Sequence, residues 1–159
     1  KSLRGQINNL LGKNAELMLR RVVSGFNNQI ISGKYFNSDK EVLLTKFDRS
    51  ASDYEYRTPT SIQIGIYQID LYAKKTTKNE IIIWLIESKN WQNAVGSKEV
   101  KEFLEKIKVV SEQENPNSLI GWFYSKSGFK TEAIKLLKQH NILFSNQTDV
   151  VELIQELGI

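Results

Sequence analysis

The sequence contains no cysteine and a single histidine, His140. The absence of cysteine excludes disulfides and thiolate metal sites, and one histidine cannot build a structural zinc site. Any metal ion would therefore be held by carboxylates, which favour a hard ion such as Mg²⁺. Long hydrophobic runs are also missing. No apolar segment approaches the roughly 20 residues of a membrane-spanning helix, and no signal peptide is visible, so we expect a cytoplasmic protein without membrane contact.

The overall composition is that of an ordinary globular chain. Its 159 residues are 40% hydrophobic and 25% charged, which predicts a single domain over residues 1–159 with a substantial core. The net charge of +4 favours an anionic partner without identifying one. Because the first residue is Lys1 and not methionine, a longer parent chain with further domains stays open.

The most informative stretch is an apolar run that ends abruptly in charge. Residues 81–86 (Ile-Ile-Ile-Trp-Leu-Ile) form an unbroken run of strand-forming residues, which is typical of a strand covered on both faces. Glu87, Ser88 and Lys89 follow directly. Residues i and i+2 of a strand point to the same side, so the sequence predicts that Glu87 and Lys89 stand together.

A second strand is predicted just upstream. Residues 68–73 (Gln-Ile-Asp-Leu-Tyr-Ala) alternate as a half-buried strand does, and the polar residues 74–79 suit a hairpin loop. Antiparallel pairing of the two strands would bring Asp70 beside Glu87 and Lys89. Burying such charges is costly unless they pair or bind a partner.

The remaining pattern predicts alternating helices and strands. Polar residues 27–40 are expected to form a loop, and Ser97 is expected to cap a helix. Crossover helices usually join parallel strands, so we predict an α/β fold with a mixed central sheet flanked by helices on both faces. The expected helices are 14–27, 98–113, 130–139 and a last one near 150–157, and the other expected strands are 41–48, 119–124 and 142–144.

Asp70, followed on the next strand by Glu87-x-Lys89, resembles the PD-(D/E)xK nuclease superfamily, which has the restriction-endonuclease-like fold. Residues 12–16 (Gly-Lys-Asn-Ala-Glu) resemble the opening helix of Holliday-junction resolvase-like members, in which a helical glutamate joins the site. Residues 121–129, with Glu132-Ala133 and Asn141-Ile142 after them, resemble the later core of type IV, methylation-dependent restriction endonucleases. Ile69 departs from the pattern because it stands where the superfamily's name-giving proline would be.

The resemblance implies a metal-dependent DNA endonuclease. Asp70, Glu87 and the backbone carbonyl of Ser88 would hold Mg²⁺, for which Mn²⁺ can substitute. Lys89 would orient the attacking water or offset charge on the phosphate. Glu16, at the border of its helix's apolar stripe, would bind a metal-bound water or a second ion. Its alternative interpretation is a solvated residue in a first helical turn.

Several alternatives stay open from the sequence. Lys89 could simply pair with Asp70 or Glu87 at a sheet edge, and the chain could be a noncatalytic nucleic-acid-binding or assembly module or a nuclease that acts on RNA. An amphipathic N-terminal helix permits a homodimer without showing one. A second carboxylate cluster of Asp48, Asp53 and Glu55 is better explained as surface turn residues. The candidate substrate contacts, each with a solvated side chain as an equal alternative, are Gln92, Arg20, Lys126 and Lys130.

Overall fold

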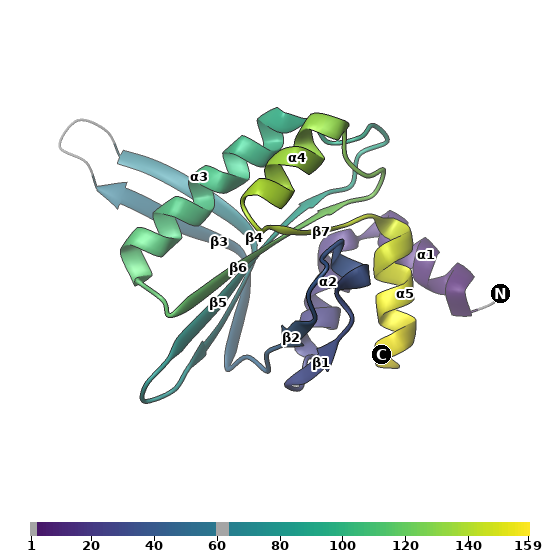
Figure 1. Cartoon of the computed structure of the whole chain (residues 1–159), viewed down its shortest axis with the longest axis horizontal. Coiled ribbons are helices and arrows are strands. Elements are labelled where there is room, and N and C mark those ends of the chain that lie inside the picture. Colours follow the sequence, from purple (N-terminus) through teal and green to yellow (C-terminus); the bar gives the residue numbers. More distant parts are fainter. Residues whose placement is uncertain (1–2, 60–63) are drawn as a thin grey trace.

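The computed structural model describes residues 3–59 and 64–159, without the side chains of residues 12, 13 and 50–67. A five-stranded sheet in the order β3-β4-β5-β6-β7 forms its centre, and β1 and β2 form a separate two-stranded ribbon (Figure 1). The strands are β1 (Gln29–Ile31), β2 (Val42–Leu44), β3 (Arg49–Pro59), β4 (Ile64–Thr76), β5 (Ile81–Lys89), β6 (Ser118–Ser125) and β7 (Leu143–Ser145). The helices are α1 (Leu3–Lys13), α2 (Ala15–Ser24), the short 3-10 helix η1 (Gly33–Phe36), α3 (Ser97–Glu114), α4 (Thr131–Gln139) and α5 (Gln147–Leu157).

The central sheet is mixed, as the sequence predicts. β3, β4 and β5 form an antiparallel meander, and β5, β6 and β7 run parallel. Helices α3 and α4 make the crossovers between the parallel strands. The predicted hairpin between β4 and β5 is confirmed, because Thr76 pairs with Ile81 and the antiparallel ladder continues from there into the sheet.

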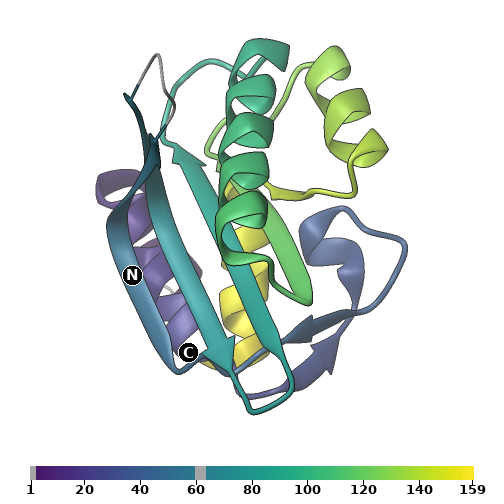
Figure 2. The same cartoon turned by 90° about the vertical axis from the view of Figure 1, so that its left-hand side faces the viewer.

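Helices cover both faces of the sheet because side chains of the central strands alternate between two cores. Trp84 and Ile86 of β5 lie in one core with α1, α2 and α5, and Ile83 and Leu85 lie in the other core with α3 and α4. Figure 2 shows α3 in front of the strands, with α1, α2 and α5 behind them. An apolar run with no polar alternation is therefore explained by burial on both sides.

Two local predictions need correction. The segment 27–40, expected as a loop, contains β1 and η1, and β1 pairs antiparallel with β2. Elements this short carry too few residues for a recognisable period. Helix α3 is capped by Gly96 and not by Ser97: the Gly96 N–H donates to the Glu99 carboxylate at 3.1 Å, so the reciprocal half of a capping box sets the helix start.

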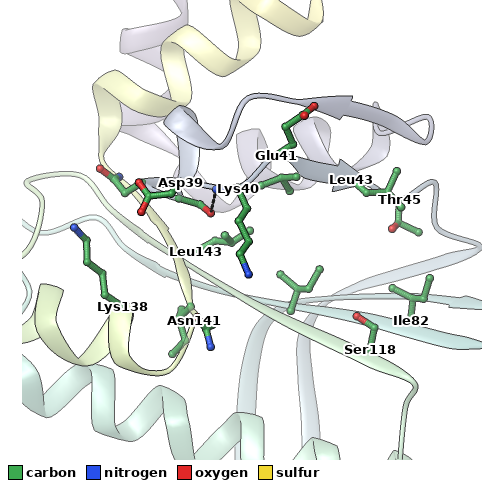
Figure 3. A pocket seen from close by; sticks show the side chains of 15 residues that line it. Asp39, Lys40, Glu41, Leu43, Thr45, Ile82, Ser118, Lys138, Asn141 and Leu143 are labelled. Carbon is green, nitrogen blue, oxygen red and sulfur yellow. Dashed lines mark hydrogen bonds between the residues drawn. The ribbon is translucent and has the colours of Figure 1, made fainter.

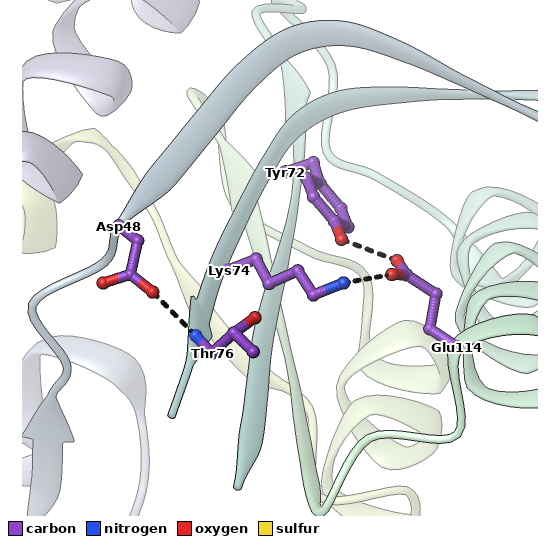
Figure 4. Close-up of polar contacts among 5 residues, drawn as sticks. All are labelled: Asp48, Tyr72, Lys74, Thr76 and Glu114. Carbon is purple, nitrogen blue, oxygen red and sulfur yellow. Dashed lines mark hydrogen bonds and ion pairs between the residues drawn. The ribbon is translucent and has the colours of Figure 1, made fainter. Parts of the chain in front are cut away.

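The C-terminal end of α3 is fixed to β4 by a partly buried polar cluster (Figure 4). The Tyr72 hydroxyl and the Lys74 ammonium donate to the two oxygens of Glu114, at 2.6 and 2.7 Å. Asp48 accepts from the Thr76 N–H at 2.7 Å and so braces the same strand from the β3 side. This cluster holds the position of α3 along the sheet, which decides which α3 side chains reach the end of β5.

The Asp48 carboxylate therefore binds the backbone of β4. Its suggested carboxylate partners were Asp53 and Glu55, whose side chains lie outside the described residues. Within the part of the chain that the structure describes, none of the helices has the length and apolar character needed to cross a membrane.

Candidate active site

The antiparallel ladder between β4 and β5 stops at the point where charged residues begin. Its last pair is Leu71 with Ile86, and the next residues in register are Asp70 and Glu87. There the Asp70 carboxylate accepts the Ser88 N–H at 2.9 Å. The strands therefore carry two carboxylates at the same place, with the Asp70 side chain occupying a position that a backbone carbonyl would hold in a continuing ladder.

Glu87 is a buried carboxylate whose two oxygens have different surroundings. Its side chain is only 3% exposed, and Oε2 accepts a hydrogen bond from the Lys106 ammonium of α3 at 2.8 Å. Oε1 is buried and has no hydrogen-bond partner among the described residues. Buried polar atoms nearly always have partners, so this oxygen calls for a bound ligand or for a proton that Glu87 shares with the neighbouring Asp70 carboxylate.

The environment of Glu87 changes its acidity. Burial raises the pKa of Glu87 from 4.5 to about 7, and the nearby charge of Asp70 raises it as well. The hydrogen bond and charge of Lys106 oppose both effects without overcoming them. A carboxyl group with such a raised pKa, beside a second carboxylate, is typical of functional sites.

This pKa predicts a pH dependence of stability in the absence of metal. Between about pH 4.5 and about pH 7 the folded chain keeps a proton on Glu87 that the unfolded chain releases. The free energy of unfolding should therefore fall as pH rises through this window, by up to about 3 kcal/mol from this group. Thermal melts in a chelator would show the fall for the wild type and a flatter profile for Glu87→Gln. Parallel profiles for the two proteins would contradict the prediction.

The backbone of Ser88 is directed toward β4, where Asp70 lies. In a strand, the N–H and C=O of one residue point to the same side, and the Ser88 N–H points to Asp70 on β4. The Lys89 carbonyl points the other way, since it accepts the Lys126 N–H beyond the end of β6, at 3.1 Å. The Ser88 carbonyl is thus directed toward the two carboxylates.

Lys89 does not make the contact that the sequence suggested. Within the described residues no carboxylate pairs with it, and its ammonium lies over the Trp91 ring, 5.2 Å from the ring centroid. The cation at the carboxylates is Lys106 of α3, a residue that the sequence pattern does not single out. Both lysines nevertheless belong to elements that meet at the carboxyl end of β5.

The other predicted site residues are spread more widely. Lys126 follows β6 next to Lys89, and Gln92 is exposed in the loop after β5. Lys130 is exposed just before α4, with its N–H bonded to Val95 O at 2.8 Å. Arg20 is exposed on α2.

Glu16 is half-buried in the first turn of α2. Helix α2 packs on the sheet face opposite α3, whereas the Glu87 carboxylate meets α3. Among the described residues, no three acidic, histidine or cysteine side chains gather closely enough to hold a metal ion. The structure therefore brings Asp70 and Glu87 together, and a role of Glu16 beside them stays a prediction.

The remaining donors still fit a hard divalent ion. Mg²⁺ is commonly held by one or two carboxylates and keeps several waters. Asp70, the orphaned Oε1 of Glu87 and the Ser88 carbonyl are all oxygen donors at one opening. Among the described residues no histidine or cysteine joins these oxygens, so the donor set fits Mg²⁺ or Mn²⁺ better than zinc.

A cavity of about 570 Å³ lies elsewhere, between the β2 side of the molecule and the start of β7 (Figure 3). Its lining includes Ile82 and Ser118, at the beginnings of β5 and β6, and Lys40 and Lys138 from the flanking segments. The carboxylates lie at the opposite ends of these strands. The cavity is therefore separate from the candidate site.

Comparison with known proteins identifies the type of domain. The family model described as restriction endonuclease matches residues 47–154, which include Asp70, Glu87 and Lys89. No curated protein sequence matches the chain.

Solved structures resemble the fold at low identity. AF1548, a protein of unknown function, is 15% identical with a TM-score of 0.51 over 69% of this chain and 58% of its own. Protein VC1899 from Vibrio cholerae is 8% identical with a TM-score of 0.53 over 70% of this chain and 27% of its own. The DNA modification-dependent restriction endonuclease AspBHI aligns at 13% identity and a TM-score of 0.45, over 99% of this chain and 35% of its own. The chain spans less than two thirds of each.

Proposed function

The chain belongs to the restriction endonuclease family, and we propose that it is a metal-dependent endonuclease domain that hydrolyses phosphodiester bonds in DNA. The observation that carries the proposal is the pairing of Asp70 with Glu87 where the β4–β5 ladder ends, with one buried Glu87 oxygen that accepts no hydrogen bond from a donor of the described residues. A purely structural sheet end has no need for a buried carboxylate in that state, because such a group costs free energy.

Asp70, Glu87 and the Ser88 carbonyl are the proposed ligands of Mg²⁺, with Mn²⁺ as a substitute. The bound ion would supply a nucleophilic water and offset charge on the phosphate. Asp70 is held in place by the Ser88 N–H, and Glu87 is held by burial, so both carboxylates are positioned before substrate binds. Preorganised groups of this kind cost no reorganisation during the reaction.

Lys89 is the proposed catalytic cation. It stands two residues from Glu87 on β5 and pairs with no carboxylate among the described residues, so its ammonium is available to a phosphate. Its four-carbon side chain can swing from the Trp91 ring, because an exposed cation–π contact holds it by only about 0.5–1 kcal/mol. Lys126, beside it at the end of β6, is a proposed phosphate contact together with Gln92, Lys130 and Arg20. Glu16 is proposed only as an accessory residue.

We further propose that residues 1–159 act as one catalytic module in the cytoplasm, an arrangement that is compatible with further domains of the same chain. A noncatalytic module with this fold is the second candidate. The observation that favours it is the Lys106–Glu87 ion pair, which already compensates the buried carboxylate. A nuclease directed at RNA has the same site chemistry and is separated from the proposal only by substrate. A homodimer is compatible with either function.

A cleavage assay tests the proposal directly. The purified chain should cut DNA in Mg²⁺ or Mn²⁺ and should be inactive in a chelator. Plasmid, linear, branched and single-stranded DNA and a single-stranded RNA would be compared under the same conditions. Cleavage of RNA alone would favour the RNA nuclease, and the absence of cleavage of every substrate in both metals would favour the noncatalytic module.

A further inference from the structure

Lys106 is the one cation in ion-pair contact with the candidate site among the described residues. Its ammonium lies 2.8 Å from Glu87 Oε2, and the two side chains are 19% and 3% exposed. It comes from the middle of α3, nineteen residues after Glu87. The contact is therefore a feature of the tertiary fold and not of the strand that carries the nuclease motif.

The surrounding structure holds the helix backbone that carries this ammonium. Val100, Phe103 and Val110 of α3 are fully buried against the sheet, and Glu114 fastens the end of the helix to Tyr72 and Lys74. These contacts fix the position of the Lys106 backbone with respect to β5. Only the lysine side chain itself is free to change its direction.

The contact is also specific to one oxygen. Lys106 engages Oε2 and leaves Oε1 buried without a hydrogen-bond partner among the described residues, next to Asp70. Without Lys106 two neighbouring carboxylates would share an opening with no compensating charge. Two like charges this close together repel each other.

A divalent cation bound at Glu87 would change the charge balance between the two carboxylates and Lys106. It would supply the positive charge that Lys106 supplies in its absence, and a dication close to the ammonium would repel it. Lysine has a flexible stem and a point charge, so it can leave the carboxylate by a rotamer change, with the helix staying in place.

From these contacts we propose that Lys106 is a positioning residue that occupies Glu87 in the metal-free protein and is displaced when the metal ion binds. The proposal rests on the proposed function, because it requires a metal ion at Asp70 and Glu87. Lys106 thus keeps the buried site folded and neutralised until the ion arrives, and its removal costs the metal-free protein stability while removing a competitor of the ion.

The proposal predicts opposite effects of Lys106→Met on folding and on metal binding. In a chelator the variant should melt below the wild type. At a pH well above the pKa of Glu87, so that no proton competes for its carboxylate, it should bind Mn²⁺ more tightly, by about tenfold or more, because about 1.4 kcal/mol of lost repulsion is already a factor of ten. Isothermal titration calorimetry with Mn²⁺, and thermal melts with and without Mn²⁺, measure both quantities. The Mn²⁺-induced rise in melting temperature should be larger for the variant than for the wild type.

Two variants serve as controls. Lys74→Met removes the other partly buried ion pair between α3 and the sheet, at 2.7 Å, which lies away from the carboxylate opening. It should lower the melting temperature equally with and without Mn²⁺ and leave the Mn²⁺ affinity unchanged. Lys106→Arg keeps a cation on Glu87 and should bind Mn²⁺ within a few fold of the wild type.

An unchanged or weaker Mn²⁺ affinity of Lys106→Met would overturn the proposal and leave Lys106 a structural ion-pair partner. If Lys106→Met does not fold without metal, Lys106→Gln keeps a hydrogen-bond donor without the charge, and the same comparison of Mn²⁺ affinities decides. Failure of the proposed function looks different: the wild type and Glu87→Gln would then be alike in showing no Mn²⁺ binding at all.

Discussion

Replacing Glu87 by glutamine is expected to abolish metal-dependent cleavage without unfolding the protein. The amide keeps the shape of the side chain but removes the charge that would hold the ion. A metal ion contributes several kcal/mol of transition-state stabilisation, so the rate should fall on the order of 1,000-fold or more. The measurement is single-turnover cleavage of the best DNA substrate in Mg²⁺, together with Mn²⁺ titration of the same preparation.

The stability of Glu87→Gln in the absence of metal should not fall with its cleavage rate. Above about pH 7 the ionised Glu87 lowers the stability of the folded protein, because burial and Asp70 both disfavour its ionisation. In a chelator at such a pH, Glu87→Gln should therefore melt at or above the temperature of the wild type. Glu105→Gln, which alters an exposed carboxylate on α3, is the matched control and should change neither cleavage nor melting. A Glu87→Gln enzyme that cuts at the wild-type rate would remove Glu87 from the mechanism.

The sequence predicted the pair of carboxylates because strand geometry is local. An apolar run followed by charge locates the end of β5, and a polar hairpin loop sets the register in which Asp70 falls opposite Glu87. The mixed sheet follows from the same local signals, because helices between strands imply parallel neighbours. These features needed no knowledge of how distant elements pack.

Lys106 could not be predicted in the same way. The sequence pattern places both Lys106 and Lys108 on the mixed charged face of α3, so it gives no reason to prefer one of them. The choice depends on how α3 lies across the sheet, which the contacts of Glu114 with β4 help to fix. Lys106 turns to Glu87, whereas Lys108 is exposed.

For Glu16, the sequence pattern predicts partial burial of the side chain but not the sheet face that its helix covers. Its place at the border of an apolar stripe indicated a side chain that looks toward the sheet, and it is half-buried in the structure. However, periodicity within α2 cannot tell which sheet face the helix will cover. Helix α2 packs in the core that contains Trp84 and Ile86, while strand alternation directs Glu87 to the α3 side.

Replacing Lys89 by methionine is the second change with a large expected effect, and it separates an enzyme from a scaffold. If Lys89 serves the chemistry, cleavage should fall on the order of 100- to 1,000-fold, because a charge at the reacting phosphate acts mainly in the transition state. DNA affinity should stay within a few fold of the wild type, since it is spread over many phosphate contacts. Cleavage kinetics and DNA binding in Ca²⁺, measured on one preparation, test both statements.

Because Lys106 pairs with Glu87, a loss of activity in Lys89→Met can be separated from a loss of stability. Had Lys89 been the partner of the buried carboxylates, its loss would leave them uncompensated and cost roughly 3–5 kcal/mol. Glu87 is instead paired with Lys106, and Lys89 contacts Trp91, so Lys89→Met should lose about 1 kcal/mol at most. Lys78→Met, in the exposed loop at the other end of β5, is the matched control. A folded Lys89→Met protein that cuts at the wild-type rate would exclude a catalytic role for this lysine, because nothing else about the site would have changed.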